Sequence, residues 1–444
     1  MENSKIERKI NETYCIKKEL YSEFNVKRGL RNKDGSGVLT GLTKISGVTG
    51  YIKEDEKIVP VEGKLCFRGI EINEIEKAIS NEKRNGFEEI VYLLIFGNLP
   101  TEDEFRSFNS ILDKNIFLPV GFKENMILKS PSSDIMNMLA RSVLALYSDD
   151  KEPDSISIEN VIRQSIELIA RFPAMIAYGY QSKSHYHDNN SMNLHNPVKG
   201  IGLAKNFLRM IRANKEFTDL EAQTLDIALI LHAEHGGGNN SAFTTHVVSS
   251  SDTDTYSAIS AAIGSLKGPK HGGANNKVMD MVHDIKLNVE NWDNIEEVSK
   301  YIAKILRKEA YDKTGLVYGI GHAVYTLSDP RAIILKRYAK ELAKVKNKEK
   351  EFMLYDIIEQ VTPKLFSEIK GIDKVISANV DFYSGFVYNM LEIPSELYTP
   401  IFAMARVAGW CAHRIEELIS GGRIIRPAYK NVEVKNEYIP IIKR

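Results

Sequence analysis

The chain has 444 residues, of which 43% are hydrophobic, and its formal net charge is zero. This length allows a large core and favours two or three domains. The balanced charge argues against a strong nucleic-acid-binding or anionic-membrane surface, while it still permits a local basic pocket.

The cysteines and the N-terminal residues indicate the cellular compartment in which the protein is expected. The cysteines are Cys15, Cys66 and Cys411, without a Cys-x-x-Cys pair, so neither a disulfide framework nor a cysteine zinc site is expected. The first residues carry acids and no apolar core, unlike a secretory signal or transit peptide. No window approaches the roughly 18 apolar residues of a membrane span. We therefore expect a soluble, cytoplasmic protein that binds neither nucleic acid nor membrane.

The start of the chain differs in pattern from the rest. Residues 1–30 mix charge with spaced apolar positions, which indicates a helical arm. Residues 38–70 are rich in glycine, threonine and β-branched side chains, which predicts a few short strands. Helical spacing then dominates. An apolar helix over 88–96 is ended by Gly97, and an apolar helical stripe follows over 135–146.

Residues 181–198 are a polar stretch with three histidines. Such a stretch is typical of a solvated surface loop. Metal binding is the alternative, but these histidines lack a recognisable ligand spacing. We therefore expect a surface loop here.

A helix start is indicated by Thr218-Asp-Leu-Glu221, which has the form of a capping box. The helix that follows should place His232 on an apolar face and stop at Gly236, with His235 in its last turn. Because strands do not alternate with helices, a parallel α/β sheet is not expected, and the fold class is mainly α-helical. Further helices are expected over 256–266, 296–308, 330–347 and 351–369.

Four polar clusters hold the residues that suggest chemistry, at 232–240, 268–275, 319–331 and 379–385. They combine histidines beside glycines with an aspartate, and arginines accompany them. This set suits acid–base chemistry on a small dicarboxylate. Proline, glycine and polar residues also cluster at 268–276, 313–322 and 379–385, which predicts domain junctions there.

The first cluster begins His232-Ala-Glu-His235 and continues with three glycines. A zinc-binding helix of the His-Glu-x-x-His kind needs its histidines four residues apart, and this segment has them three apart. We therefore interpret His232 as a buried, hydrogen-bonded structural histidine. His235 is the better candidate for a ligand, because the glycines allow the backbone to approach closely.

Two further histidines lie beside glycines. His271 follows the helix breaker Gly268-Pro269. A neutral imidazole there could donate a hydrogen bond to a developing enolate oxygen. The alternative interpretation is a turn histidine that caps the next helix. His322 follows Gly319-Ile-Gly321, which lacks the spacing of a dinucleotide site. Its backbone could still fold around a ligand's ring or phosphates.

Asp381 and the arginines supply charge. Asp381 lies in a mostly apolar stretch, which would raise its pKa and suit a general base. The alternative interpretation is that Asp381 is the N-cap of the next helix. Arg331 stands in the first turn of an expected helix, where its charge opposes the helix dipole, a cost that a carboxylate ligand could offset; a surface arginine is the alternative. Arg406 lies within an apolar helix and needs an anionic partner. Arg426, before Pro427, lies in a terminal extended segment that could reach a second subunit.

With these residues in this order and spacing, the chain resembles the citrate synthase family over roughly residues 38–444. The resemblance implies a mostly helical dimer, or a hexamer of dimers, whose large and small domains close on substrate. It places the large domain at 1–272 and 383–444 and the small domain at 273–382. The most specific stretches are 231–276, 316–331, 379–410 and 423–428.

The resemblance also implies a catalytic role for three residues. Asp381 would remove a methyl proton from acetyl-CoA, His271 would stabilise the enol or enolate, and His322 would polarise the oxaloacetate carbonyl and donate to the new alkoxide. Citryl-CoA would then be hydrolysed to citrate. The chain would thus be an acyltransferase of the tricarboxylic acid cycle. It would need no metal, and it would need no cofactor, since acetyl-CoA is a substrate.

Binding roles are implied in the same way. The oxaloacetate carboxylates and oxygen would be held by His235, Arg331, Arg406 and the partner subunit's Arg426. The adenine of CoA would be cradled by the backbone of a segment that includes Leu316, Val317, Gly319 and Gly321.

Two features depart from the family pattern. Thr326 stands where some members have a basic residue for the CoA phosphate. The helical arm lacks the larger β-rich extension of the NADH-inhibited hexamers, so we expect a homodimer without strong NADH inhibition.

Three alternatives remain open. A 2-methylcitrate synthase would use the same catalytic set with propionyl-CoA. A non-catalytic CoA-binding regulator would keep the fold, although the complete catalytic set argues against it. A metal-dependent hydrolase would use His232, His235, His271 and His322.

Overall fold

The computed structural model describes residues 2–55, 57–371, 375–420 and 422–443. It comprises two compact units, Met1–Leu42 and Thr43–Arg444. The first unit contains the helices α1 (Glu2–Tyr14) and α2 (Lys18–Glu23) and the short helix η1 (Arg28–Leu30). The predicted helical arm is therefore confirmed.

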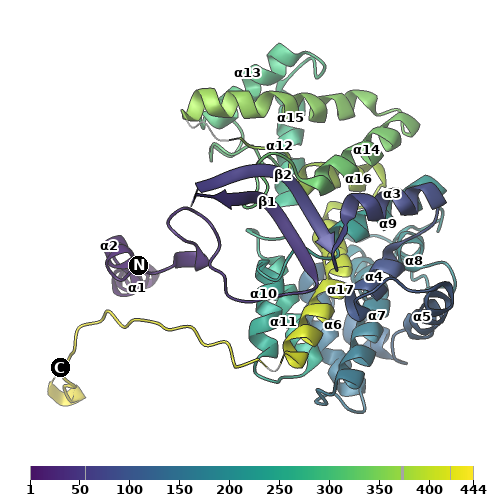
Figure 1. Cartoon of the computed structure of the whole chain (residues 1–444), viewed down its shortest axis with the longest axis horizontal. Helices are drawn as coiled ribbons and strands as arrows, with labels where there is room; N and C mark the ends of the chain where they lie inside the picture. Colours follow the sequence, from purple (N-terminus) through teal and green to yellow (C-terminus); the bar gives the residue numbers. More distant parts are fainter. Residues whose placement is uncertain (1, 56, 372–374, 421, 444) are drawn as a thin grey trace. The chain divides into compact units, whose positions relative to one another are not determined.

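The second unit begins with a small antiparallel sheet in the order β1-β2-β3, of which β1 and β2 lie side by side in Figure 1. β1 (Ser46–Glu54) pairs along β2 (Lys57–Phe67), and β3 (Ile70–Glu71) pairs with the end of β2. Ser46 lies opposite Phe67, and the register shifts between Thr49 and Tyr51. These strands confirm the short strands predicted within residues 38–70.

Two glycines bring this sheet into backbone contact with the segment that follows His322. A Cβ atom at Gly50 would lie 2.5 Å from the carbonyl oxygen of Val324, and one at Gly63 would lie 2.1 Å from that of Ser328. The Gly63 N–H also donates to Ser328 Oγ at 3.1 Å. Only glycine allows this approach, so the sheet supports residues 322–328 directly.

Helices form most of the second unit (Figure 1). Short helical segments are η2 (Lys123–Leu128), η3 (Tyr147–Asp149), η4 (Ser395–Leu397) and η5 (Ile441–Lys443). The helices are α3 (Ile72–Glu82), α4 (Phe87–Phe96), α5 (Glu102–Asn115), α6 (Ile135–Leu146), α7 (Ile158–Asp188), α8 (Leu203–Ile211), α9 (Asp219–His232), α10 (Asn240–Ser249), α11 (Thr255–Lys267), α12 (Ala274–Asn288), α13 (Ile295–Leu306), α14 (Pro330–Val345), α15 (Glu349–Lys370), α16 (Val380–Met390) and α17 (Tyr398–Ile419). The mainly α-helical fold class is confirmed.

Helix α17 lies at the centre of the core. It packs against α4, α7, α9, α10 and α11, and every residue from Ala403 to Ile415 is buried. Two arginines, Arg406 and Arg414, are buried with it. No described helix combines the length and apolar character needed to cross a bilayer.

Helices α12 to α16 form a second packed group. α16 packs against α12 and α14, while α15 packs against α13 and α14. This group overlaps the predicted small domain at 273–382, although α16 continues to Met390. The predicted boundaries themselves stay a prediction.

Several local signals acted as expected. Thr218 and Glu221 form a capping box, in which each accepts from the other's backbone N–H, at 3.2 Å and 2.9 Å. Gly97 ends α4 in the left-handed conformation. Both helix ends therefore follow from short-range chemistry.

The prediction of a loop over 181–198 is wrong for 181–188, which complete α7. Polar side chains there find buried partners in other elements. Gln181 Nε2 donates to the carbonyl of Ile211, and Ser182 Oγ donates to that of Ile127, both at 3.3 Å. These partners satisfy groups that the sequence alone assigns to solvent.

Candidate active site

The first histidine cluster follows the end of α9. The helix ends at His232, so the prediction that His235 lies in its last turn is wrong. Beyond the helix end, the N–H of Gly236 donates to Ser46 Oγ on β1, at 3.0 Å, and not to a helical carbonyl. His235 is therefore presented by a turn beyond the helix.

His232 is buried, as expected, but it is not the hydrogen-bonded histidine that we expected. Neither ring nitrogen has a hydrogen-bond partner among the described residues. The ring packs on Phe402, with centroids 4.5 Å apart. Burial, with Arg331 and Arg406 nearby, holds the His232 pKa well below its usual range, so the ring is neutral.

His235 and His322 meet edge to face, with ring centroids 5.3 Å apart. Nδ1 of His322 accepts from the backbone N–H groups of Val324 and Tyr325, both at 3.1 Å, which places the proton of a neutral ring on Nε2. Nε2 of His235 is buried without a hydrogen-bond partner among the described residues. Burial, Arg331 and His322 keep the His235 pKa well below its usual range.

His271 belongs to a hydrogen-bonded group at the start of α10. Its Nε2 lies 3.1 Å from the hydroxyl of Ser241. That hydroxyl accepts from Trp410 Nε1–H at 3.0 Å and also lies 3.0 Å from Asn239 Oδ1. Burial, reinforced by Arg406, lowers the His271 pKa to about 4, so the ring is neutral near pH 7.

Arg331 is held by the residue that caps its own helix. Nε and Nη2 bind the two oxygens of Asp329, at 3.0 Å and 2.8 Å, and both side chains are buried. Asp329 also accepts from the backbone N–H of Val380, at 3.2 Å. The helix-dipole cost that we expected a ligand to offset is thus offset within the chain. Nη1 of Arg331 has no hydrogen-bond partner among the described residues.

Arg406 is fully buried and only partly bonded. Its Nε donates to the carbonyl of His232 at 2.7 Å, and its guanidinium lies over Phe402, 4.7 Å from the ring centroid. Nη1 and Nη2 are buried without a partner among the described residues. Burial lowers the Arg406 pKa to about 10, which leaves the group charged at neutral pH. A buried cation with unused donors fits an anionic ligand.

Asp381 lies in the first turn of α16. Asn379 is the N-cap, because its Oδ1 accepts from the Asp381 N–H at 2.9 Å, so the alternative that Asp381 itself caps the helix is wrong. Burial raises the Asp381 pKa to about 6, against the lowering effect of Arg331. The carboxylate is therefore ionised at neutral pH and more basic than usual.

All the predicted catalytic and oxaloacetate-binding residues except Arg426 share one region. The charge of Arg406 acts on His235, His271 and Asp381. Arg426 is exposed in the extended segment after α17 and makes no hydrogen bond or ion pair to a described residue. Its role in a partner subunit's site stays a prediction.

The predicted CoA segment lies beside the start of α16. Asn379 N–H donates to the Gly319 carbonyl, and Asn379 Nδ2 donates to the Gly321 carbonyl, both at 2.8 Å. Gly319 and Gly321 have φ values of 79° and 103°. Leu316 is exposed, while Val317 is buried. Their contact with CoA stays a prediction.

Sequence reasoning missed several residues that hold this site in place. Asp329 had a local signal, since an aspartate before Pro330 at a helix start is a typical N-cap. Ser241 and Trp410 had none, because they meet across 169 residues of sequence. Tyr325, which stacks on His322 with centroids 4.9 Å apart, also had none.

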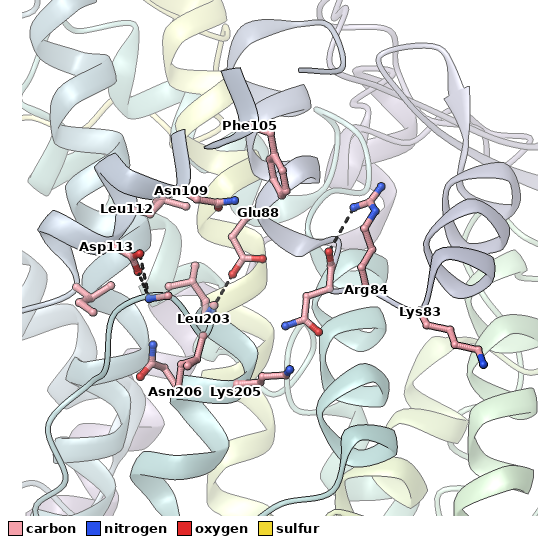
Figure 2. Close-up of a pocket in the computed structure, with 15 residues that line it drawn as sticks. Lys83, Arg84, Glu88, Phe105, Asn109, Leu112, Asp113, Leu203, Lys205 and Asn206 are labelled. Carbon is pink, nitrogen blue, oxygen red and sulfur yellow. Dashed lines mark hydrogen bonds between the residues drawn. The ribbon is translucent and has the colours of Figure 1, made fainter. Parts of the chain in front are cut away.

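A cavity of about 450 Å³ lies elsewhere, beside the start of α8, and none of the predicted site residues lines it (Figure 2). Its carboxylates have backbone partners. Glu88 accepts from Leu203 N–H at 2.6 Å, and Asp113 accepts from Gly200 N–H at 3.0 Å (Figure 2). These acids hold the segment that leads into α8, so we assign the cavity no catalytic role.

Known proteins resemble the chain over nearly its whole length. Residues 35–428, which include every predicted site residue, match the family described as citrate synthase, C-terminal domain. A citrate synthase from Synechocystis sp. is 34% identical over 418 residues, covering 93% of this chain and 94% of that protein. A 2-methylcitrate synthase 1 from Corynebacterium glutamicum is 30% identical over 429 residues, covering 95% and 100%.

Solved structures agree. A citrate synthase from Thermoplasma acidophilum, in a ternary complex with carboxymethyl coenzyme A and oxaloacetate, superposes with a TM-score of 0.76 at 27% identity. The match covers 94% of this chain and 99% of that one. A citrate synthase from Pyrobaculum aerophilum superposes with a TM-score of 0.75 at 29% identity, covering 92% and 94%.

Proposed function

Because the chain belongs to the citrate synthase family, we propose that its buried site joins acetyl-CoA to oxaloacetate and hydrolyses the citryl-CoA formed to citrate and CoA. The chain is an enzyme, an acyltransferase that converts the acyl group to alkyl on transfer.

The observation that carries this proposal is the buried guanidinium of Arg406 with its two unpartnered ends. Arg331 adds a second buried guanidinium, with Nη1 unused. Two substrate carboxylates need such fixed positive charges, and the planar fork of arginine binds a carboxylate through parallel hydrogen bonds. His235 Nε2, also unpartnered, is available for a third contact. A small dicarboxylate such as oxaloacetate fits this set.

Asp381 is the proposed base. The methyl group of a thioester is a very weak carbon acid, so a carboxylate needs an electrophilic partner on the thioester carbonyl. The raised Asp381 pKa improves the base, and His271 is the proposed partner. A neutral His271 matches a developing enolate without placing a full positive charge beside Arg406.

Ser241 decides which nitrogen of His271 can donate. Its hydroxyl has one proton, and both Asn239 Oδ1 and His271 Nε2 lie within reach of it, at 3.0 Å and 3.1 Å. We propose that the proton goes to His271 Nε2 during the reaction. The ring then carries its own proton on Nδ1, from which it donates to the enolate oxygen.

His322 is the proposed donor to the oxaloacetate carbonyl. Two backbone N–H groups occupy Nδ1, so a neutral ring presents an Nε2–H. Polarising the ketone makes its carbon more electrophilic, and the same N–H can stabilise the alkoxide formed when the new carbon–carbon bond closes.

A second candidate substrate is propionyl-CoA. The 2-methylcitrate synthase 1 from Corynebacterium glutamicum is nearly as similar to the chain as the citrate synthases are. One extra methylene in a pocket is worth about 1–3 kcal/mol, so a few neighbouring side chains decide the preference. We propose acetyl-CoA as the preferred substrate.

The choice of acyl group is tested by CoA release from the purified chain with oxaloacetate, comparing acetyl-CoA with propionyl-CoA. We expect kcat/KM to be roughly 10–200-fold higher with acetyl-CoA, the range one methylene supports. A preference for propionyl-CoA would move the assignment to 2-methylcitrate synthesis. Excess chelator separates these enzymes from a metal-dependent hydrolase, because we expect CoA release to persist in it.

The pH profile tests the assignment of the base. The ionised Asp381 is the active form, so kcat/KM should be level well above pH 6, fall to half its plateau near pH 6, and fall about tenfold per pH unit well below it. With its pKa at about 4, His271 should remain neutral over most of this range and add no step of its own near pH 6. A level profile down to pH 5 would contradict this assignment.

We further propose a homodimer in which the partner subunit's Arg426 completes the oxaloacetate site. The proposal includes a small domain at 273–382 that closes on the large one, with the Leu316–Gly321 backbone around the adenine of CoA. It also includes action in the cytoplasm, within the tricarboxylic acid cycle, without a cofactor and without strong NADH inhibition. Its support is the match of the whole chain to this family.

A further inference from the structure

A row of histidines and glutamates joins α10 to α17, outside the groups proposed to touch substrate. His246 of α10 and His413 of α17 face each other, with Nε2 of the first 3.0 Å from Nδ1 of the second. The other ring nitrogen of His413 bonds Glu234 Oε1 at 2.9 Å, and that of His246 bonds Glu417 Oε2 at 2.7 Å. His413 is fully buried, and the His246 side chain is 13% exposed.

The number of protons on the two rings indicates that a proton or a metal cation lies between His246 Nε2 and His413 Nδ1. A carboxylate only accepts hydrogen bonds, so each ring donates its N–H outward, to Glu234 or to Glu417. Two neutral rings arranged in this way would point lone pairs at each other across 3.0 Å. The contact therefore requires an extra proton or a metal cation.

Glu416 provides a third donor atom at the same place. Its Oε1 accepts from the backbone N–H of Lys44 at 2.7 Å. Its Oε2 is buried, has no hydrogen-bond partner among the described residues and lies 3.9 Å from His413 Nδ1. The donor atoms of His246, His413 and Glu416 all lie within 4.8 Å of one another.

We propose that His246 Nε2, His413 Nδ1 and Glu416 Oε2 bind one divalent transition-metal cation, of which Zn²⁺ is the best fit. Two imidazoles and a carboxylate form a set that Zn²⁺ commonly takes, with water in the fourth position. Zinc–nitrogen bonds of about 2.0–2.1 Å in a tetrahedral site separate the two nitrogens by roughly 3.3 Å. The rings, at 3.0 Å, need only a small movement to admit the ion.

The surroundings of the three donors also suit a metal. Histidines that bind metals usually donate their other ring N–H to a carboxylate, which fixes the tautomer and makes the ligand nitrogen more basic. Both histidines here have that partner, Glu234 for one and Glu417 for the other. The His246 and Glu416 side chains are partly exposed, so the three donor atoms lie close to the protein surface.

The ion would fasten two helices that serve the proposed reaction. Ser241, which bonds His271, lies at the start of α10, and Arg406 and Trp410 lie on α17. Glu234 stands next to His235 in the chain. A metal at this place would therefore stabilise the framework of the site without touching substrate.

The test uses the purified full chain, stripped with chelator and dialysed, and Zn²⁺ alone as the probe. Competition with a chromophoric zinc indicator should show one tight equivalent per chain, and Zn²⁺ should raise Tm because it binds the folded state. His246→Ala and Glu416→Gln should each weaken the affinity at least tenfold. Glu417→Gln should weaken it about 10–100-fold, as expected for the partner of a ligand.

The matched control is His283→Ala, which removes an exposed histidine and should leave zinc binding unchanged. Glu416→Gln is nearly isosteric, so it reports on the site even if His246→Ala folds poorly. Absence of tight zinc binding would mean that a shared proton satisfies the rings and would overturn the proposal, as would binding that survives both ligand variants. None of these readouts depends on CoA release, so they fail or succeed separately from the proposed function.

Discussion

Replacing Asp381 with asparagine is expected to lower kcat for CoA release by about 10²–10⁴-fold, the usual contribution of a positioned general base. Asparagine nearly matches the shape of aspartate but cannot accept the methyl proton. The hydrogen bond that ties this residue to its cap uses the backbone N–H, so α16 should keep its start. The measurement is kcat with saturating acetyl-CoA and oxaloacetate at pH 8.

Oxaloacetate binding provides the control for this variant. The substitution removes a negative charge that faces Arg331 and Arg406, so oxaloacetate should bind at least as tightly as before, measured as the ligand-induced rise in Tm. Asp381→Glu retains a carboxylate in a displaced position, so its kcat should lie between that of the parent enzyme and that of the asparagine variant. A kcat within tenfold of the parent enzyme in the asparagine variant would show that another group is the base.

Replacing Arg406 with methionine is expected to weaken oxaloacetate binding by about 2–5 kcal/mol, the usual effect of removing one partner of a buried charge pair. That corresponds to roughly 30- to 5000-fold in Kd. The free protein should not be destabilised in proportion, because the charge that is lost has two unpartnered ends in the absence of ligand. The measurement is Kd for oxaloacetate together with Tm in its absence.

Arg414→Met is the matched control, two turns further along the same helix. Arg414 is also buried, but its guanidinium donates to Ser249, Thr253 and Thr255, at 3.2 Å, 2.6 Å and 3.1 Å. Its loss should lower Tm, because buried partners lose their donor, while the Kd for oxaloacetate stays close to the parent value. Equal effects of both substitutions on Kd would show that Arg406 acts only through the fold.

Local signals in the sequence predicted the helices well. The Thr218–Glu221 capping box and Gly97 are satisfied within a few residues of themselves, so no distant contact can override them. The stretch at 181–188 was predicted wrongly for the opposite reason. Its polar side chains bond carbonyls 30 and 55 residues away, and only the folded chain brings those groups together.

The candidate site shows the same division. His271, His322 and Asp381 stand beside glycines or a helix start, which marked them in the sequence. Their supporting groups meet them only in the folded chain, as Ser241 meets His271 across 30 residues. The hydrogen bonds that choose a tautomer or hold a guanidinium are therefore set by tertiary structure, which residue spacing does not reveal.

The carboxylate of Asp329 makes three structural interactions at once, and this restricts which substitutions the enzyme can accept during evolution. One carboxylate caps α14, forms an ion pair with Arg331, which we propose binds oxaloacetate, and accepts from the N–H of Val380, next to the proposed base. Asparagine would keep the cap but give up the charge, and glutamate would change the reach of all three bonds. Selection on the arginine therefore also acts on the helix that carries the base, and the two cannot drift independently.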